Sequence, residues 1–220
     1  MTHASHPYAH RLGILRDWKS RWSGPIDKYQ EYLKADVLLR EYLEEKLRSF
    51  HVSSVEMERT EKTLRIIIKT SRPGMIIGRS GEGSVQLKND VLKFIRKKKL
   101  IDTEEVKIDI EEVKHPESDA TIVAHMIAET LEKRFPFRRI MKQSIDKVMA
   151  NRDVLGAKIS LSGRLGNADM SRKESIKKGR IPLQTFRADV DYANIPARLP
   201  SYGLVGVKVW IYKGEIFDKE

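Results

Sequence analysis

The 220-residue chain contains no cysteine. Disulfide bonds are therefore excluded, and so are metal sites built from thiolates. This composition suits the reducing cytoplasm, which is the location that we expect. No apolar run approaches the roughly 18 residues that a membrane-spanning helix requires, and no signal-peptide core follows Met1. We therefore expect no membrane partner.

Aromatic side chains are scarce, at 7% of the residues, and acidic residues are outnumbered by basic ones. With 42 Lys and Arg against 31 Asp and Glu, the formal net charge is +11. Such a surplus predicts a polyanionic partner, nucleic acid before an anionic membrane. Because few aromatic rings are available for stacking on bases, we expect phosphate contacts to dominate the binding.

The sequence shows no catalytic constellation, and we expect neither a cofactor nor a bound metal ion. His3, His6 and His10 come closest to a metal motif, but they lie in a terminal segment without fixed geometry. Asp189 and Asp191 fall on one face of an expected strand beside an arginine. This pattern indicates a salt-bridged surface rather than an acid–base pair.

A glycine-rich stretch over residues 72–83 separates an expected strand at 63–70 from an expected helix at 82–98. Its centre, Gly-Arg-Ser-Gly at 78–81, is the Gly-x-x-Gly element with which KH domains clamp a few backbone nucleotides. Glycines let the backbone come within hydrogen-bonding range of a phosphate, and the following helix adds its positive N-terminal end. The predicted RNA-binding loop consists of Arg72, Gly78, Arg79, Ser80 and Gly81.

Three other interpretations of this loop are weaker or less specific. The spacing of Gly78 and Gly83 matches a Walker A loop, but Ser84 stands where the phosphate-binding lysine should be. A dinucleotide fingerprint requires the reverse order of glycine spacings. An ordinary glycine-rich turn is the third alternative. The apolar residues 75–77 before the glycines and the basic helix after them favour RNA.

The first half of the chain has the element order of a type II KH domain. A helical pattern begins at Ile26, and its expected core stripe comprises Val37, Leu38, Tyr42, Leu43 and Leu47. Strands at 52–59 and 63–70, the glycine loop, the helix at 82–98 and a strand at 106–113 complete the unit. The break at His115-Pro116 marks a domain boundary.

The second half predicts two helices followed by strands. Ile122, Val123, Met126, Ile127 and Leu131 form one apolar stripe, and Phe137, Ile140, Met141, Ile145 and Val148 form the next. Beyond Gly156 the period changes to two, around residues 158–162, 186–192 and 205–212. These are three strands of a half-buried antiparallel sheet whose other face the helices cover. Residues 164–180 are predicted to form a basic loop or short helix.

These patterns predict an α+β protein. An N-terminal arm spans residues 1–25, a helix and a type II KH domain span 26–115, and a C-terminal two-layer α/β domain with an antiparallel sheet spans 116–220. The arm interleaves basic and aromatic residues. It either becomes ordered on RNA or a partner protein, or packs on its own domain.

Three cations of the second C-terminal helix cluster on one side. At 100° per residue, Arg138, Arg139 and Lys142 fall within an arc of about 100°, away from the expected core side. Such a cluster fits a phosphate track. On charge alone, a solvated basic face is the simpler interpretation.

The ordered set of motifs resembles the family of the bacterial small-subunit ribosomal protein number three. The segments that carry this resemblance lie at residues 11–14, 72–81, 137–142, 162–166, 179–183, 187–192 and 206–211. The glycine loop alone is weakly specific, whereas the ordered set across both domains is very specific. Ser80 and Gln143 stand where basic residues are common in the family.

This resemblance implies a non-enzymatic structural protein in the head of the 30S subunit, within the cytoplasmic 70S ribosome. The implied partners are 16S rRNA, messenger RNA and the neighbouring head proteins numbers ten and fourteen. Arg138, Arg139 and Lys142 would help line the path by which messenger RNA enters and help open structured messages. The basic residues expected to contact rRNA are Arg11, Lys19, Arg21, Arg164, Arg172, Lys173, Lys177, Lys178 and Arg180.

A free KH-domain RNA chaperone or regulator is the alternative function. An RNA-processing enzyme is disfavoured, because the phosphate-binding lysine and a metal cluster are both missing from the sequence.

Overall fold

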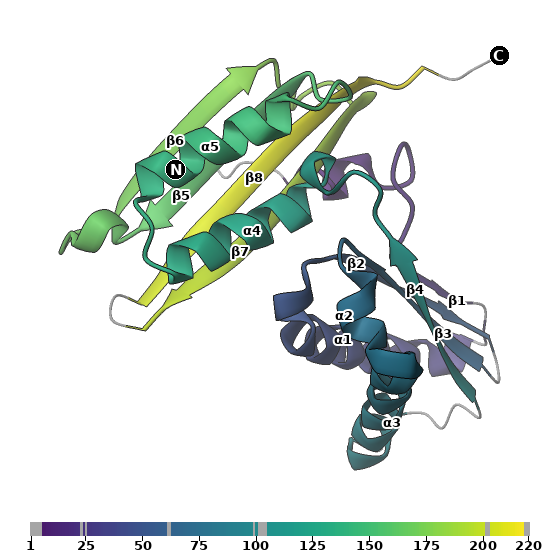
Figure 1. Cartoon of the computed structure of the whole chain (residues 1–220). Helices are drawn as coiled ribbons and strands as arrows, with labels where there is room; N and C mark the ends of the chain where they lie inside the picture. The colour runs from purple at the N-terminus through teal and green to yellow at the C-terminus, as the bar shows by residue number, and fades with distance from the viewer. Residues whose placement is uncertain are drawn as a thin grey trace. The chain divides into compact units, whose positions relative to one another are not determined.

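The computed structural model describes residues 6–22, 24, 26–60, 63–98, 100, 105–200 and 203–217. They form two compact units, shown in Figure 1. One unit runs from Trp18 to Lys114, and the other combines the described residues up to Asp17 with those from His115 onward. The N-terminal segment therefore divides between the two units.

The first unit is a four-stranded sheet with its helices on one face (Figure 1). Its elements are β1 (Ser20–Trp22), η2 (Ile26–Lys28), α1 (Tyr29–Lys46), η3 (Arg48–Phe50), β2 (Val52–Arg59), β3 (Thr63–Thr70), α2 (Pro73–Ile77), η4 (Arg79–Gly81), α3 (Glu82–Lys97) and β4 (Glu105–Glu112). The strand order is β1-β2-β3-β4, with β2 and β3 antiparallel and the two outer pairs parallel. This arrangement confirms the type II KH prediction.

The buried stripe of α1 is shifted from the predicted one. Leu43 and Leu47 are buried as expected, but Val37 is 44% exposed and Leu39 takes the core position. Since α1 carries apolar residues around more than one side, periodicity alone left its orientation open. Leu64, Ile66 and Ile68 of β3 complete the core with the buried face of α3.

The second unit has two layers, a four-stranded antiparallel sheet and two helices that cover one face of it (Figure 1). Its elements are η1 (Ala9–Arg11), η5 (Pro116–Ser118), α4 (Ala120–Glu132), α5 (Phe137–Met149), β5 (Gly156–Gly163), η6 (Leu165–Asn167), β6 (Arg172–Gly179), β7 (Ala188–Leu199) and β8 (Gly203–Glu215). The strand order is β6-β5-β8-β7. The predicted α+β class and the two-layer C-terminal domain are confirmed.

One element of this unit was predicted wrongly. The segment expected as a basic loop or short helix contains β6, which pairs with β5 along its whole length. Its single apolar side chain, Ile176, packs against the core, while the remaining side chains are polar or charged. Charged edge strands of this kind resist pairing with other chains, and their polarity conceals the usual strand signal.

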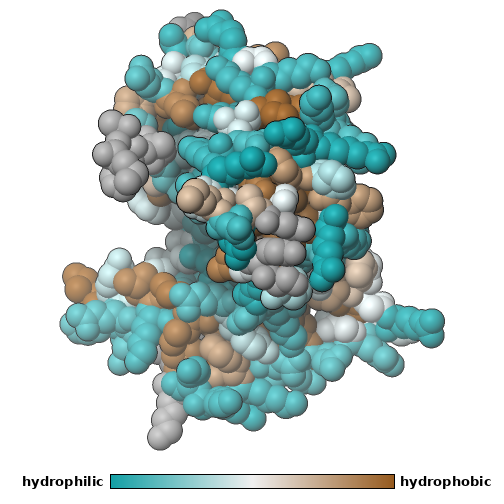
Figure 2. Space-filling view, turned by 90° about the vertical axis from the view of Figure 1, so that its left-hand side faces the viewer, coloured by the Kyte–Doolittle hydropathy of each residue, from teal (hydrophilic) through white to brown (hydrophobic). Residues whose placement is uncertain are grey.

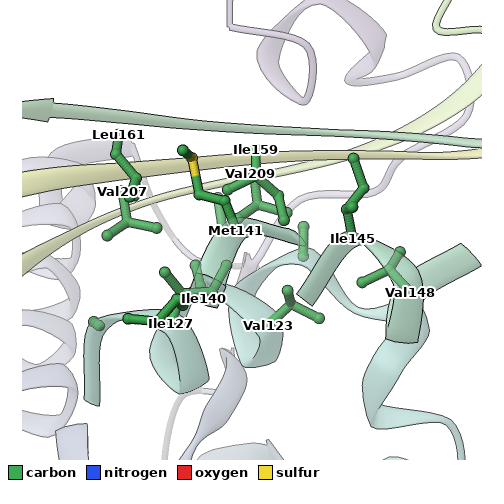
Figure 3. Packing of buried hydrophobic residues seen from close by; sticks show 14 of the residues in the cluster. Val123, Ile127, Ile140, Met141, Ile145, Val148, Ile159, Leu161, Val207 and Val209 are labelled. Atoms are coloured by element: carbon green, nitrogen blue, oxygen red, sulfur yellow. The ribbon is translucent and has the colours of Figure 1, made fainter. Parts of the chain in front are cut away.

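The core of the second unit lies between the helices and the inner strands. In Figure 3, Val123 and Ile127 of α4 and Ile140 and Met141 of α5 point toward the strands that carry Ile159, Leu161, Val207 and Val209. The predicted helical stripes are buried except for Met126 and Phe137, which are half-buried. Burial of such side chains stabilises the fold by about 25 cal/mol per Å² of apolar surface. The two helices are therefore rigid supports for their exposed residues.

Candidate RNA-binding surfaces

The glycine loop is fixed at its start by β3 and α2. The Thr70 hydroxyl donates to Phe50 O at 2.8 Å and accepts from the Arg72 N–H at 3.1 Å. Pro73 then occupies the start of α2, where a missing N–H costs nothing. The helix ends at Gly78, whose φ of 70° and ψ of −172° are accessible essentially to glycine alone.

Two glycines allow α2 and the start of α3 to approach closely. A Cβ added to Gly83 would lie 2.5 Å from Ile76 O, and one added to Gly78 would lie 3.1 Å from Gly83 N. Gly81 is in the left-handed region at φ 81°. The loop therefore needs glycine for its backbone geometry, beyond giving access to a ligand.

The tip of the loop is open to solvent. Arg79 and Ser80 are exposed, and Ser80 adopts a left-handed φ of 53°. Gly81 precedes α3 and has no side chain that could cap the first N–H groups of that helix. The backbone thus offers donors beside a cation, which is the arrangement that the Gly-x-x-Gly motif predicts.

Positive charge around the loop is only partly compensated. Arg72 and Lys93 are exposed, and Lys93 Nζ lies 4.0 Å from a carboxylate oxygen of Asp90. Asp90 of α3 is hydrogen-bonded to Lys46 of α1, which lowers the pKa of that carboxyl below its ordinary value. Asp90 therefore remains ionised and has a cationic partner of its own. Exposed apolar side chains flank the loop and offer contacts to sugars and bases: Met75, Ile77 and Val85.

The predicted arc on α5 lies on the exposed side of the helix. Arg138, Arg139 and Lys142 are all exposed, opposite the buried Ile140 and Met141. Arg138 Nε lies 3.8 Å from a carboxylate oxygen of Glu174, and its guanidinium is 5.7 Å from the Phe137 ring centroid. Within the part of the chain that the structure describes, Arg139 and Lys142 have no carboxylate within 4.0 Å.

A cavity of about 260 Å³ opens beside this arc, between α4 and α5. Arg139 and Lys147 line it together with the apolar side chains of Met126, Phe135 and Val148. Of the three cations of the arc, Arg139 thus stands beside an apolar recess.

The predicted basic residues of β6 divide between its two faces. Arg172 and Lys178 point to the helix side, where they pair with Glu174 at 3.3 Å and with Asp146 at 3.0 Å. Lys173 and Lys177 alternate with them and are exposed on the opposite side of the sheet. The strand therefore presents two ion-paired cations and two cations that have no carboxylate partner among the described residues.

Arg11 does not fit the role predicted for it as an RNA contact. Its side chain is 1% exposed and donates hydrogen bonds to five carbonyls, those of Pro7, Pro182, Leu183, Thr185 and Ala188. Since all the carbonyls belong to its own unit, Arg11 fastens the N-terminal segment to the C-terminal sheet. Its guanidinium is not accessible to a phosphate.

The remaining predicted contacts have different surroundings. Arg21 pairs with Glu56 at 2.7 Å and with Glu58 at 3.9 Å, and Arg164 donates to Ala168 O at 3.0 Å. Lys19 and Arg180 are exposed. These four residues divide between the two units, with Lys19 and Arg21 in the first and Arg164 and Arg180 in the second.

The predicted salt-bridged strand around residue 190 uses other partners than expected. Asp189 pairs with Arg16 at 2.6 Å, and Arg187 pairs with Glu215 at 3.1 Å. Asp191 accepts from the Ala120 N–H at 2.9 Å and so supports the start of α4. Both carboxylates are engaged by the protein itself.

The N-terminal histidines have aromatic neighbours. His6 lies edge-on to Tyr192 at 4.6 Å, and His10 stacks on Phe186 at 4.6 Å, whereas His3 lies outside the described residues. In the described ranges, no three or more His, Cys, Asp or Glu side chains gather so that they could hold a metal ion. No helix in those ranges is long and apolar enough to cross a membrane.

Comparison with known proteins matches both units. A KH domain family model matches residues 38–118, and a model described as ribosomal protein S3, C-terminal domain, matches residues 127–211. The small ribosomal subunit protein uS3 of Clostridium novyi is 43% identical over 211 residues, 96% of this chain and 92% of that protein. Those of Caldicellulosiruptor bescii and Xanthomonas euvesicatoria are also 43% identical, over 98% and 99% of this chain and 93% and 86% of their own.

The chain belongs to the uS3 family of ribosomal proteins. The family resemblance found in the sequence is thereby confirmed. The KH model spans the glycine loop, and the uS3 C-terminal model spans the α5 arc and β6. Both candidate surfaces therefore lie in segments that this chain shares with other uS3 proteins.

Proposed function

We propose that this uS3-family chain is a structural constituent of the head of the small ribosomal subunit, where it binds 16S rRNA. The observation that carries the proposal is an exposed Gly-x-x-Gly loop on a KH fold, in a chain that aligns with uS3 relatives almost end to end. The backbone of the loop and the side chains of Arg72 and Arg79 would contact phosphates. The role is non-enzymatic, within the cytoplasmic 30S subunit and 70S ribosome, beside head proteins numbers ten and fourteen.

The proposed second role concerns messenger RNA at the point where it enters. Arg138, Arg139 and Lys142 stand on a helix whose other side is packed in the core, so their backbone positions are fixed. Cations held in place attract the phosphates of a passing strand whatever its sequence. When a duplex opens at this point, the same cations hold the separated strand and oppose its reannealing.

The restraint on Arg138 supports this role. The Phe137 ring and Glu174 limit the freedom of the long Arg138 side chain without burying it. The side chain remains 73% exposed. Less conformational entropy is therefore lost when a phosphate binds. Arg139 and Lys142 have no ion pair in the described residues and bring uncompensated charge.

Sedimentation of a cell extract through a sucrose gradient tests the proposed assembly. The chain, detected by an antibody, should migrate with small subunits and with whole ribosomes. After dissociation at low magnesium it should remain with the small subunit. A chain found mainly at the top of the gradient would contradict the proposal and favour a free KH-domain RNA chaperone or regulator.

A further inference from the structure

The sheet of the second unit has a helix-free face that is rich in lysine. The helices α4 and α5 cover one face, onto which Ile159, Ile176 and Val209 point. The strand register places the alternate residues on the other face, in three rows across β6, β5 and β8. The rows are Lys177, Lys158 and Trp210, then Ser175, Ser160 and Lys208, then Lys173, Ser162 and Gly206.

The four lysines of this face have no acidic partner in the described part of the chain. Lys173 and Lys177 are exposed at the edge strand, while Lys158 and Lys208 are half-buried farther in. The Lys158 Nζ lies 5.1 Å from the Trp210 ring centroid, which keeps this ammonium over the sheet. No carboxylate lies within 4.0 Å of any of these four ammonium groups in those ranges.

The sheet of the KH unit shows the contrasting arrangement. Its helix-free face carries Arg21, Arg65 and Lys69, and each of them pairs with a carboxylate. The Glu56 carboxylate accepts hydrogen bonds from both Arg21 and Lys69, each at 2.7 Å. Within one chain, one open sheet face neutralises its cations and the other leaves them uncompensated. Charge complementarity thus indicates a polyanion on the second face.

The other groups on this face favour an RNA backbone over exposed bases. Trp210 is 9% exposed, so it offers little surface for base stacking. Ser162 and Ser175 supply hydroxyl groups beside the lysines, and Asn194 of β7 supplies an amide next to Lys208. Lys173 and Lys177 stand about 13 Å apart along their strand, and neighbouring strands are about 4.8 Å apart. Double-helical RNA is recognised through such phosphate and 2′-hydroxyl contacts, with little reading of sequence.

We propose that the helix-free sheet face binds the sugar–phosphate backbone of a double-helical RNA segment through Lys158, Lys173, Lys177 and Lys208. The inference rests on the proposed function in taking RNA as the partner. It adds a surface that lies outside both the glycine loop and the α5 arc, and two lysines, Lys158 and Lys208, that the sequence did not single out.

The test compares two variants of the full chain that carry the same change of charge. In one, Lys158, Lys173, Lys177 and Lys208 are each replaced by Gln. In the control, four exposed lysines elsewhere are replaced by Gln: Lys28, Lys34, Lys114 and Lys133. Fluorescence anisotropy measures binding to a 20-base-pair RNA hairpin and to a 20-nucleotide uridine strand.

The sheet-face variant should bind the hairpin at least about fivefold more weakly than the control variant. Its log–log salt slope should also be shallower, by about one for each phosphate that the variant no longer neutralises. The uridine strand should distinguish the two variants much less. Thermal denaturation checks that both are folded. If the quadruple sheet-face variant is not folded, a double variant replaces it, with Lys173→Gln and Lys177→Gln at the exposed edge strand. This double variant should still give about half of the change in salt slope.

Equal affinities of the two quadruple variants for the hairpin would overturn the inference. An equal loss on the uridine strand would overturn the assignment to a duplex, and displacement of the hairpin by polyglutamate at matched charge would favour an acidic protein partner instead. Failure here is distinct from failure of the proposed function. If the sheet-face variant binds normally while Arg79→Asp with Ser80→Asp does not, the KH role stands and only this surface is rejected.

Discussion

A single buried arginine fastens the N-terminal segment of the chain to the C-terminal sheet. Arg11 reaches five carbonyls through a planar group with several fixed donors. A lysine would keep the charge but could not match this geometry. The position is thus specific for arginine for structural reasons, although its sequence context suggested RNA binding.

The substitution Arg11→Lys should destabilise the second unit. Several buried carbonyls would lose their donors, and each unsatisfied polar group costs about 1–3 kcal/mol. We expect a loss of roughly 2–4 kcal/mol in the free energy of unfolding, because water and the new ammonium satisfy some of the carbonyls. Urea titration followed by circular dichroism measures it. A change below about 0.5 kcal/mol in the free energy of unfolding would show that the hydrogen bonds from Arg11 to the five carbonyls do not stabilise the unit.

Gly83 should not tolerate even a methyl group. In an unobstructed helix, alanine is favoured over glycine by about 1 kcal/mol. At Gly83 the added Cβ would meet Ile76 O at 2.5 Å, so Gly83→Ala should lower the protection of α3 amides in hydrogen exchange. Gly74→Ala is the matched control, because no atom lies within 4 Å of its added Cβ. Equal protection in the two variants would contradict the close approach of α2 and α3.

At the scale of elements, sequence patterning predicted most of the fold. The strand at residues 63–70 and the two C-terminal helices are where period and turn residues placed them. The strand β6 was missed because its exposed edge favours charged residues, which erase the apolar alternation. The orientation of α1 was missed because tertiary packing selects among its several apolar sides.

The candidate site was predictable to a different degree in each element. The glycine loop and the α5 arc follow from local motif and helical geometry, and the structure exposes both. The sequence could not show that Arg11 and Arg21 contact the protein itself, because their partners lie about 170 and 35 positions away. The alternation of lysine and serine in β5 did signal one outward face, but only the register with β6 and β8 gathers the four lysines.

The glycine loop as an element should control RNA affinity without controlling the fold. Replacing Arg79 and Ser80 by Asp changes the charge at an exposed tip by three units, so phosphates should be repelled. We expect RNA affinity to fall at least about tenfold with an unchanged melting temperature. Gln30→Asp with Lys34→Asp on the exposed side of α1 is the control of equal charge. An affinity equal to that of this control would remove the loop from the binding surface.

At the scale of the whole molecule, charge is abundant but selectively compensated. The net charge is +11, yet many arginines and lysines are paired, as on the open sheet face of the KH unit. Within the described residues, the cations without a carboxylate partner include Arg72 and Arg79 of the glycine loop, Arg139 and Lys142 of the α5 arc, and the four lysines on the open face of the second sheet. In the space-filling view, hydrophilic side chains cover most of the visible face (Figure 2). Binding by the whole chain should therefore be dominated by phosphates.

Salt should weaken the binding of RNA to the full chain along a straight line in a log–log plot. Each phosphate contact releases counterions, and the slope rises by about 0.7–0.9 for each contact. Because three surfaces carry cations without carboxylate partners in the described residues, we expect the magnitude of the slope to be at least about three. Anisotropy titrations between 50 and 300 mM potassium chloride provide the measurement. A flat response would mean that stacking or apolar contacts carry the affinity instead.

The most direct measurement for the proposed ribosomal role is the rate of translation through a stable messenger RNA hairpin by ribosomes in which Arg138, Arg139 and Lys142 are alanine. Exposed substitutions of this kind usually change stability by no more than about 0.5 kcal/mol, so the variant should still assemble into small subunits. Such ribosomes should translate unstructured messages at nearly the parental rate and slow several-fold at the hairpin. Equal rates through the hairpin for variant and parent, at matched ribosome occupancy, would contradict the account.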